Sequence, residues 1–189
     1  MNEFWRWFAQ AEPRLRAAHP REVTGEIEDR VRLFDPRIGV ELGDADVREL
    51  IFTVYVQVEA FDLVKALVAA APAFPAWRMI ALKPPRGFDF AIDVNGQQVD
   101  AAAITFEALD APAMPGAIGI RCFVDDALWS DDNSKGILRL IIATGIGEEA
   151  AARITYLEAA PRGRAPAEPI RIEALAEFIG WQDLRTLKN

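Results

Sequence analysis

The hydrophobic residues of this chain change their spacing along the sequence, and this change limits the folds open to it. Over residues 3–34 they recur every three or four positions, as on the buried face of an amphipathic helix. From Ile38 to Leu42 they alternate with polar residues or glycine, as in a strand with one buried face. The chain therefore combines helices and half-buried strands.

Helical spacing predicts helices over residues 3–18, 21–34, 58–70 and 171–180, and a short helix near 147–152. Pro13 lies inside the first of these segments. It either kinks the helix or opens a second short helix at its first position, where the missing N–H has no cost. Asp35-Pro36 marks the end of the second helix.

Alternating, β-branched and aromatic runs predict strands over residues 38–42, 48–56, 77–82, 88–94, 103–109, 117–124, 136–143 and 153–158. The first two strands form an antiparallel hairpin. Asn95-Gly96 is typical of the two-residue turn between antiparallel strands. Residues 131–136 are rich in turn-forming side chains, and they are expected to join the strand ending at 124 to the one beginning at 136.

This order of elements predicts an α+β fold. We expect a largely antiparallel β-sheet packed by the N-terminal helices and by the central helix at 58–70. The 189 residues fit a single domain, 1–189. Residues 160–169, which include three prolines, are expected to be a surface linker before a C-terminal helix.

Charge and cysteine content indicate a cytoplasmic protein. The formal net charge is −8 at pH 7, which disfavours nucleic acids and anionic membranes as partners. The uncharged stretch 66–77 is too short to span a bilayer and contains two prolines. The first residues lack the cationic and apolar regions of a signal peptide. Cys122 lies in an apolar run, so we expect a buried, reduced thiol.

One segment matches the Gly-x-Gly-x-x-Ala form of a dinucleotide-binding loop, from Gly145 to Ala150. Glu148 and Glu149 would lie where the diphosphate binds, and Glu158 follows too early to be the ribose-binding acid. Too few elements follow to complete a nucleotide-binding fold. We therefore expect no cofactor, and interpret the segment as a strand end that turns into a short helix.

The acidic residues between 125 and 132 suggest calcium binding, and the run Asp131-x-Asn133-x-Lys135-Gly136 resembles the start of an EF-hand loop. Lys135 replaces one ligand, and Ile142 stands where a bidentate glutamate is required. A solvated turn is therefore expected, and no metal site is predicted. His19, the single histidine, excludes a zinc site made of several histidines. It lies between a helix end and a proline, where we expect it to interact with the helix dipole.

A pair of carboxylates can perform acid–base catalysis without any motif. Glu41, on the strand at 38–42, and Glu107, inside the strand at 103–109, are the candidate residues, with Arg86 as a cationic third. They would suit a hydrolase-like enzyme acting on a small polar substrate. Solvent-facing strand positions explain both carboxylates without catalysis.

Two features suit the binding of another protein. The loop from Lys83 to Gly87 is basic and held by two prolines, so an acidic partner segment could dock on Lys83 and Arg86; an ordinary connection between strands is the alternative. The motif Phe4-Trp5-x-Trp7-Phe8 should lie mostly in the core. Trp5, at the margin of the helical face, is a partner-binding candidate if its side chain is exposed.

The motif Phe4-Trp5-x-Trp7-Phe8, the run Arg48–Thr53, and Ala71-Pro72 followed by Trp77 resemble a family of small, uncharacterised bacterial cytosolic proteins. The resemblance extends to Gly147-Glu148 and covers most of the chain. It implies a bacterial, cytosolic origin and carries no activity or catalytic residue.

Three classes of function remain open at this point. The first is a non-catalytic module that binds another protein, which the lack of a catalytic motif and the aromatic N-terminal helix favour. The second is the acid-dependent enzyme described above. The third is a small-ligand binding module, which requires an enclosed apolar pocket between helices and sheet.

Overall fold

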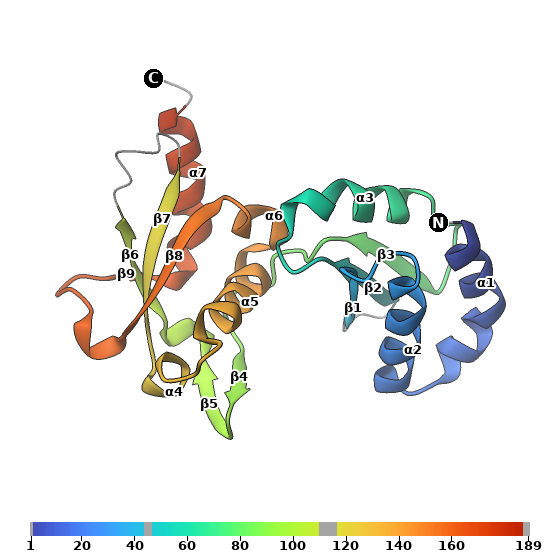
Figure 1. Cartoon of the computed structure of the whole chain (residues 1–189), viewed down its shortest axis with the longest axis horizontal. Coiled ribbons are helices and arrows are strands. Elements are labelled where there is room, and N and C mark those ends of the chain that lie inside the picture. The colour runs from blue at the N-terminus through green and yellow to red at the C-terminus, as the bar shows by residue number, and fades with distance from the viewer. Residues whose placement is uncertain (1, 44–46, 110–116, 187–189) are drawn as a thin grey trace. The chain divides into compact units, whose positions relative to one another are not determined.

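The structure, a computed structural model, describes residues 2–43, 47–109 and 117–186. The chain divides into two compact units, Met1–Pro84 and Pro85–Asn189. Each unit has its own helices and strands (Figure 1). The expectation that residues 1–189 behave as one domain stays a prediction.

The first unit packs three helices with one small sheet. Its elements are α1 (Asn2–Ala17), α2 (Pro20–Arg32), β1 (Gly39–Gly43), β2 (Arg48–Thr53), α3 (Phe61–Ala69) and β3 (Trp77–Ala81). Strands β1 and β2 form the predicted antiparallel hairpin. Strand β3 pairs with β2 in parallel, and α3 lies in the crossover that a parallel pair requires.

The face of α1 that enters the core differs by one residue from the predicted face. The buried residues of this helix are Phe4, Trp5, Phe8, Ala11 and Leu15. Trp5, which the sequence places at the margin of the helical face, is buried, whereas Trp7 is only partly buried. The ring of Trp5 packs edge-on against Phe52, with centroids 5.8 Å apart. This burial is favourable because the indole N–H finds a backbone acceptor inside the core.

Arg48, the first residue of β2, connects the sheet to the end of α1. Its guanidinium donates to the carbonyl oxygens of Leu15 at 3.0 Å and Ala18 at 3.3 Å. It also lies 5.6 Å from the ring centroid of Trp77. The last carbonyls of a helix have few partners within the helix, and Arg48 adds a hydrogen bond to two carbonyls at this end of α1.

The second unit has a four-stranded sheet and a separate hairpin. Its elements are β4 (Ala91–Val94), β5 (Gln97–Asp100), β6 (Thr105–Leu109), β7 (Ile118–Val124), α4 (Asp126–Trp129), α5 (Ser134–Ile146), α6 (Glu148–Ala151), β8 (Ile154–Pro161), β9 (Ile170–Arg171) and α7 (Leu175–Thr186). The sheet has the order β8-β7-β6-β9. Strands β4 and β5 form the predicted hairpin, and Asn95 and Gly96 at its turn have positive φ angles of 53° and 83°.

The prediction of a strand over residues 136–143 is wrong, because these residues lie in α5. A short continuous apolar run does not by itself distinguish a buried strand from a buried helix. Strands β7 and β8 are parallel neighbours, so the chain between them has to cross over, and α5 forms part of that crossover. Its buried residues include Leu138, Ile141 and Ile142.

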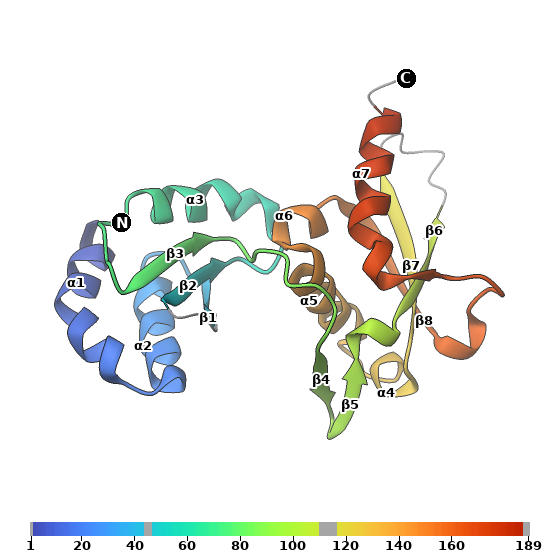
Figure 2. The same ribbon diagram turned by 180° about the vertical axis from the view of Figure 1, so that it is seen from behind.

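Residues 162–169 join β8 to β9 and are exposed for most of their length, whereas residues 160 and 161 of the predicted linker belong to β8. They include a short 3₁₀ turn, Arg162–Arg164. The two-residue strand β9, which the sequence did not predict, follows this segment and pairs with β6. Helix α7 then lies against the sheet (Figure 2), where the rings of Phe106 and Phe178 are 5.4 Å apart.

The α+β class is confirmed. Among the described strands, β1–β2, β4–β5, β6–β7 and β6–β9 are antiparallel, and β2–β3 and β7–β8 are parallel. The strands form three small sheets instead of one. No helix in the described ranges is both long enough and apolar enough to cross a membrane.

Candidate functional site

The alternation of side chains along β7 gives the four-stranded sheet two different faces. Phe106 of β6 pairs with Cys122 of β7, and Phe106 packs against α7. Because successive side chains point to opposite sides of a strand, Arg121 lies on the other face. Its cross-strand neighbours are Glu107 on β6 and Glu158 on β8. A charged residue therefore occupies the centre of an otherwise apolar strand, on the side away from Phe106.

Arg121 forms ion pairs with both neighbouring strands. Its Nη1 donates to Glu107 Oε1 at 2.6 Å, and its Nε donates to Glu158 Oε2 at 2.7 Å. The hydroxyl of Tyr156 donates to the other oxygen of Glu158, Oε1, at 2.6 Å. We refer to Glu107, Arg121, Tyr156 and Glu158 as the Arg121 cluster.

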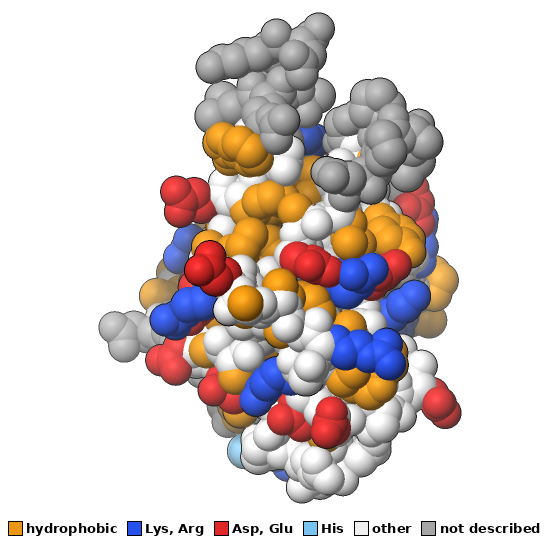
Figure 3. All heavy atoms as spheres, turned by 90° about the vertical axis from the view of Figure 1, so that its left-hand side faces the viewer, with side chains coloured by type: hydrophobic (Ala, Val, Ile, Leu, Met, Phe, Trp, Pro, Cys, Tyr) orange, Lys and Arg blue, Asp and Glu red, His pale blue; other side chains and the backbone are white. Residues whose placement is uncertain are grey.

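The Arg121 cluster is partly exposed to solvent. The side chains of Arg121, Glu107 and Glu158 are 37%, 33% and 29% exposed, and Tyr156 is 48% exposed. Figure 3 shows a face of the molecule on which acidic and basic side chains lie close together among exposed hydrophobic ones. The cluster is therefore held in place by its own hydrogen bonds and still accessible to another molecule.

Hydrogen bonds in the cluster stabilise the charged forms of Glu158 and Arg121 and the neutral form of Tyr156. The Tyr156 hydroxyl and the Arg121 guanidinium lower the pKa of Glu158. Glu158 and Glu107 raise the pKa of Arg121, and hydrogen bonding to Glu158 raises the pKa of Tyr156. A general acid or base works best with a pKa near the working pH, and Glu158 is shifted away from neutrality. The arrangement suits recognition through fixed charges better than proton transfer.

Glu41, the other candidate carboxylate, has a different partner. It forms an ion pair with Lys83, whose side chain is buried. The Lys83 ammonium also lies 5.7 Å from the ring centroid of Tyr55. Glu41 and Glu107 thus belong to two separate ion pairs. The burial of Lys83 corrects the expectation that it projects from the loop toward a partner.

Arg86 has an exposed side chain, as a docking residue would require. Its backbone is held in place, because its N–H donates to the carbonyl of Thr144 at 3.0 Å. The next residue, Gly87, donates in the same way to Gly145 at 3.0 Å and has a positive φ of 76°. The loop after Pro85 is therefore tied to the end of α5.

Trp5 was a partner-binding candidate only if its side chain was exposed, and this condition is not met. Trp5 is only 3% exposed, and its indole N–H is bonded to Leu67. Its amphipathic ring stabilises the core of the first unit, so it does not offer a contact surface.

The acidic residues between 125 and 132 act as turn and cap residues. Asp125 accepts from the N–H of Ala127 at the start of α4, and Asp131 accepts from the N–H of Asn133. Within the described ranges, no three His, Cys, Asp or Glu side chains lie close enough together to hold a metal ion. His19 caps the start of α2, where it accepts from the N–H of Arg21 at 3.3 Å. The expected interaction with the dipole at the end of the preceding helix stays a prediction.

The segment from Gly145 to Ala150 covers the end of α5, Gly147 and most of α6, so the expected strand end before it is wrong. The strand–loop–helix context of a dinucleotide-binding loop is therefore missing. Gly145 instead allows close packing, since a Cβ there would lie 2.2 Å from the ring of Phe88. Gly147 has a positive φ of 86° between the two helices.

Of the Arg121 cluster, only Glu107 was predicted from the sequence as a site residue; Arg121, Tyr156 and the pairing role of Glu158 were not. The sequence feature that could have pointed to the cluster is the single arginine, Arg121, inside the apolar run 118–124. No family model, curated protein or solved structure matches this chain. The resemblance to a bacterial family stays a prediction, and any function has to be argued from the site itself.

Proposed function

We propose that this protein is a non-catalytic module that binds another protein, and that the partner docks on the sheet face carrying the Arg121 cluster. The observation that supports this most is the cluster itself: an arginine fixed by two carboxylates beside a half-exposed tyrosine. Tyrosine and arginine are enriched among the residues that dominate binding energy at protein interfaces.

The fixed geometry also lowers the cost of binding. Arg121 and Glu158 are already held by hydrogen bonds, so little side-chain entropy is lost when a partner covers them. The cluster carries two negative charges and one positive charge, which favours a partner surface that presents lysine or arginine. The net charge of −8 also favours a basic partner surface and disfavours nucleic acid as the partner.

The enzyme alternative required two carboxylates close together with pKa values suited to proton transfer. Glu107 and Glu158 share one guanidinium, and the pKa of Glu158 is lowered. These observations favour binding over acid–base chemistry. We place the activity in the bacterial cytoplasm, because Cys122 is a buried free thiol and the sequence resembles bacterial cytosolic proteins.

Affinity capture from a bacterial lysate, followed by reconstitution with the purified partner, tests the proposal. Tyr156→Thr removes the ring and keeps a residue that is favourable in strands. Tyr55→Asn is the matched control, because Tyr55 is equally exposed at 48% and its φ of 51° is one that asparagine tolerates. We expect Tyr156→Thr to weaken binding of the purified partner at least about tenfold, and Tyr55→Asn to leave it unchanged. A captured partner that binds both variants equally well would contradict the proposal.

A further inference from the structure

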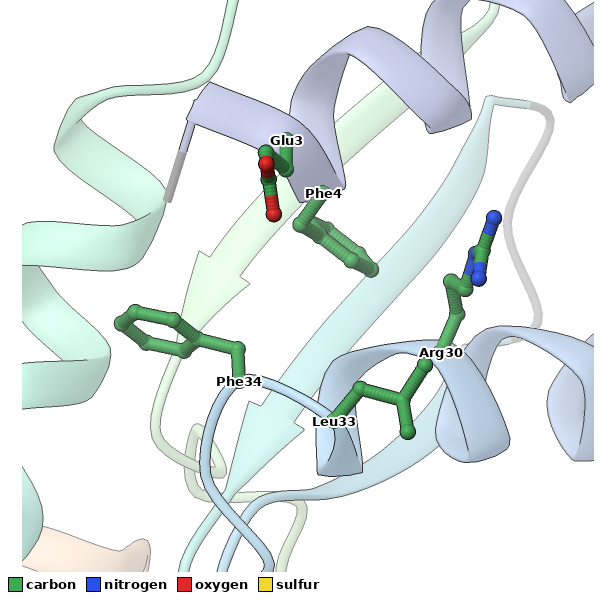
Figure 4. Close-up of a pocket in the computed structure, with 5 residues that line it drawn as sticks. All are labelled: Glu3, Phe4, Arg30, Leu33 and Phe34. Carbon is green, nitrogen blue, oxygen red and sulfur yellow. The ribbon is translucent and has the colours of Figure 1, made fainter.

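A hollow of about 360 Å³ lies in the first unit, between the start of α1 and the end of α2. Figure 4 shows the five residues that line it: Glu3, Phe4, Arg30, Leu33 and Phe34. Ligand sites usually have volumes of about 300–1,000 Å³, so this one suits a small molecule. Its lining residues belong to the first unit and the Arg121 cluster to the second, so ligand binding here is independent of the proposed function.

The apolar part of the hollow includes a side chain that no described residue covers well. Leu33, just after α2, is 76% exposed, the highest fraction among the exposed large hydrophobic residues of the described chain. Phe4 is buried, and Phe34 is partly buried. An apolar group placed against these three side chains would remove Leu33 from water, which is favourable.

The charges of the hollow lie on opposite sides of it. In Figure 4, Glu3 from α1 and Arg30 from α2 lie on opposite sides of the Phe4 ring. Arg30 is held 5.4 Å from the ring centroid of Trp7. This cation–π contact fixes the position of the guanidinium without neutralising its charge.

Neither of these two charged residues forms an ion pair with another described residue. Their neighbours do form them, because Arg14 pairs with Glu26 and Arg32 pairs with Glu28. Arg30 acts on Glu26 only through space, where it contributes to the lowered pKa of that carboxyl. The acidic and basic groups of the hollow are therefore available to a ligand.

We infer that the hollow binds a small zwitterion whose ammonium and carboxylate are separated by an apolar body, namely a short peptide of apolar residues with free ends. The ammonium would pair with Glu3, and the carboxylate would pair with the planar guanidinium of Arg30. The apolar side chains would lie on Phe4, Leu33 and Phe34. A ligand of this class is complementary to the hollow in charge as well as in polarity.

The first test compares three forms of one dipeptide on the intact protein. Leu-Leu, N-acetyl-Leu-Leu and Leu-Leu-amide are titrated into ¹⁵N-labelled protein, and backbone chemical shifts give the affinity and the location. We expect Leu-Leu to shift the resonances of residues 3–8 and 30–35. Blocking either end should weaken binding about two- to fivefold, the range for an exposed ion pair.

The second test assigns each end of the peptide to its residue. Glu3→Gln should weaken Leu-Leu about two- to fivefold and have no further effect on the acetylated form. Arg30→Gln should likewise weaken Leu-Leu about two- to fivefold and have no further effect on Leu-Leu-amide. Leu33→Ser should weaken all three forms about fivefold or more, because it removes the apolar contact. The controls are Arg32→Gln, a paired arginine on the same helix, and Leu140→Ser, an exposed leucine of the second unit.

All five substituted side chains are exposed or at the surface, and thermal unfolding of each variant confirms that the fold is kept. Equal binding of the free and blocked peptides would overturn the inference, because the charges would then play no part. The same conclusion would follow if Leu33→Ser bound like the wild type. The absence of shifts at residues 3–8 and 30–35 with millimolar Leu-Leu would also overturn it.

Discussion

The indole N–H of Trp5 donates to the carbonyl oxygen of Leu67 at 2.9 Å, across 62 positions of the sequence. Leu67 lies in the last turn of α3, where backbone carbonyls have no partner within the helix. Trp5 therefore pairs a buried acceptor that would otherwise remain unsatisfied, and it links α1 directly to α3.

Replacing Trp5 with phenylalanine should reveal the value of this bond. Trp5→Phe leaves the carbonyl of Leu67 buried without its donor, so we expect a loss of about 1–3 kcal/mol in the free energy of unfolding. Trp7→Phe is the control, because Trp7 is only partly buried and should cost less than about 1 kcal/mol. Urea unfolding followed by circular dichroism measures both. Equal losses in the two variants would show that ring size, and not the hydrogen bond, decides the effect.

Two glycine substitutions should have opposite effects on stability. At Gly145 a Cβ would lie 2.2 Å from the ring of Phe88, so Gly145→Ala should destabilise the protein by about 1–3 kcal/mol. Gly25 lies inside α2, and a Cβ added to it would have no other atom within 4 Å. Gly25→Ala should therefore stabilise the protein by about 0.5–1 kcal/mol. Thermal unfolding compares the two variants. A stable Gly145→Ala protein would show that Phe88 moves aside without cost.

Asp35 should make the stability depend on pH in the acid range. Hydrogen bonds from the Arg37 side chain and backbone lower the pKa of Asp35 to about 2, below the value near 4 of an unfolded chain. A folded-state pKa below the unfolded value means that the stabilisation is present above pH 4 and is lost as the pH falls to 2. Asp35→Asn should therefore be less stable than the wild type at pH 6, and the difference should vanish near pH 2. Arg37→Gln should remove the same pH-dependent contribution to the free energy of unfolding. If stability varied with pH in both variants as it does in the wild type, Asp35 would not be the group responsible.

Cys122 should be unreactive in the folded protein. It is fully buried, and this burial raises the pKa of its thiol to about 12. Thiol reagents attack the thiolate, so we expect no labelling by DTNB at neutral pH and one equivalent of labelling after unfolding in guanidinium chloride. Rapid labelling under native conditions would mean that the sheet around β7 opens far more often than its packing suggests.

Removing the Tyr156 hydroxyl should change the titration of Glu158. The hydroxyl is the largest cause of the lowered pKa of this carboxyl, with Arg121 next. Tyr156→Phe should therefore raise the pKa of Glu158 toward its ordinary value, as measured by ¹³C NMR of the side-chain carboxyl. Glu173, whose pKa is lowered by Arg171, provides an internal reference that should not move. A constant pKa at Glu158 would mean that the hydroxyl does not donate to it in solution.

The sequence by itself determined most local structure of this protein. The four-residue spacing of Val23, Ile27 and Val31 produced α2, and Asn95-Gly96 produced the β4–β5 turn. Such features depend on neighbours in the chain, whose propensities and spacing are visible in the residues themselves. For the same reason the α+β class could be predicted.

Only the tertiary structure decided which residues meet across long distances. The run 136–143 is a helix because β7 and β8 are parallel and need a crossover between them. Trp5 is inside because α3 offers it an acceptor, and Arg121 meets both Glu107 and Glu158 because the register of three strands aligns them. Pairing between strands and docking between helices depend on contacts far apart in the sequence. No local pattern of side chains encodes them, so the sequence could name Glu107 but not its partners.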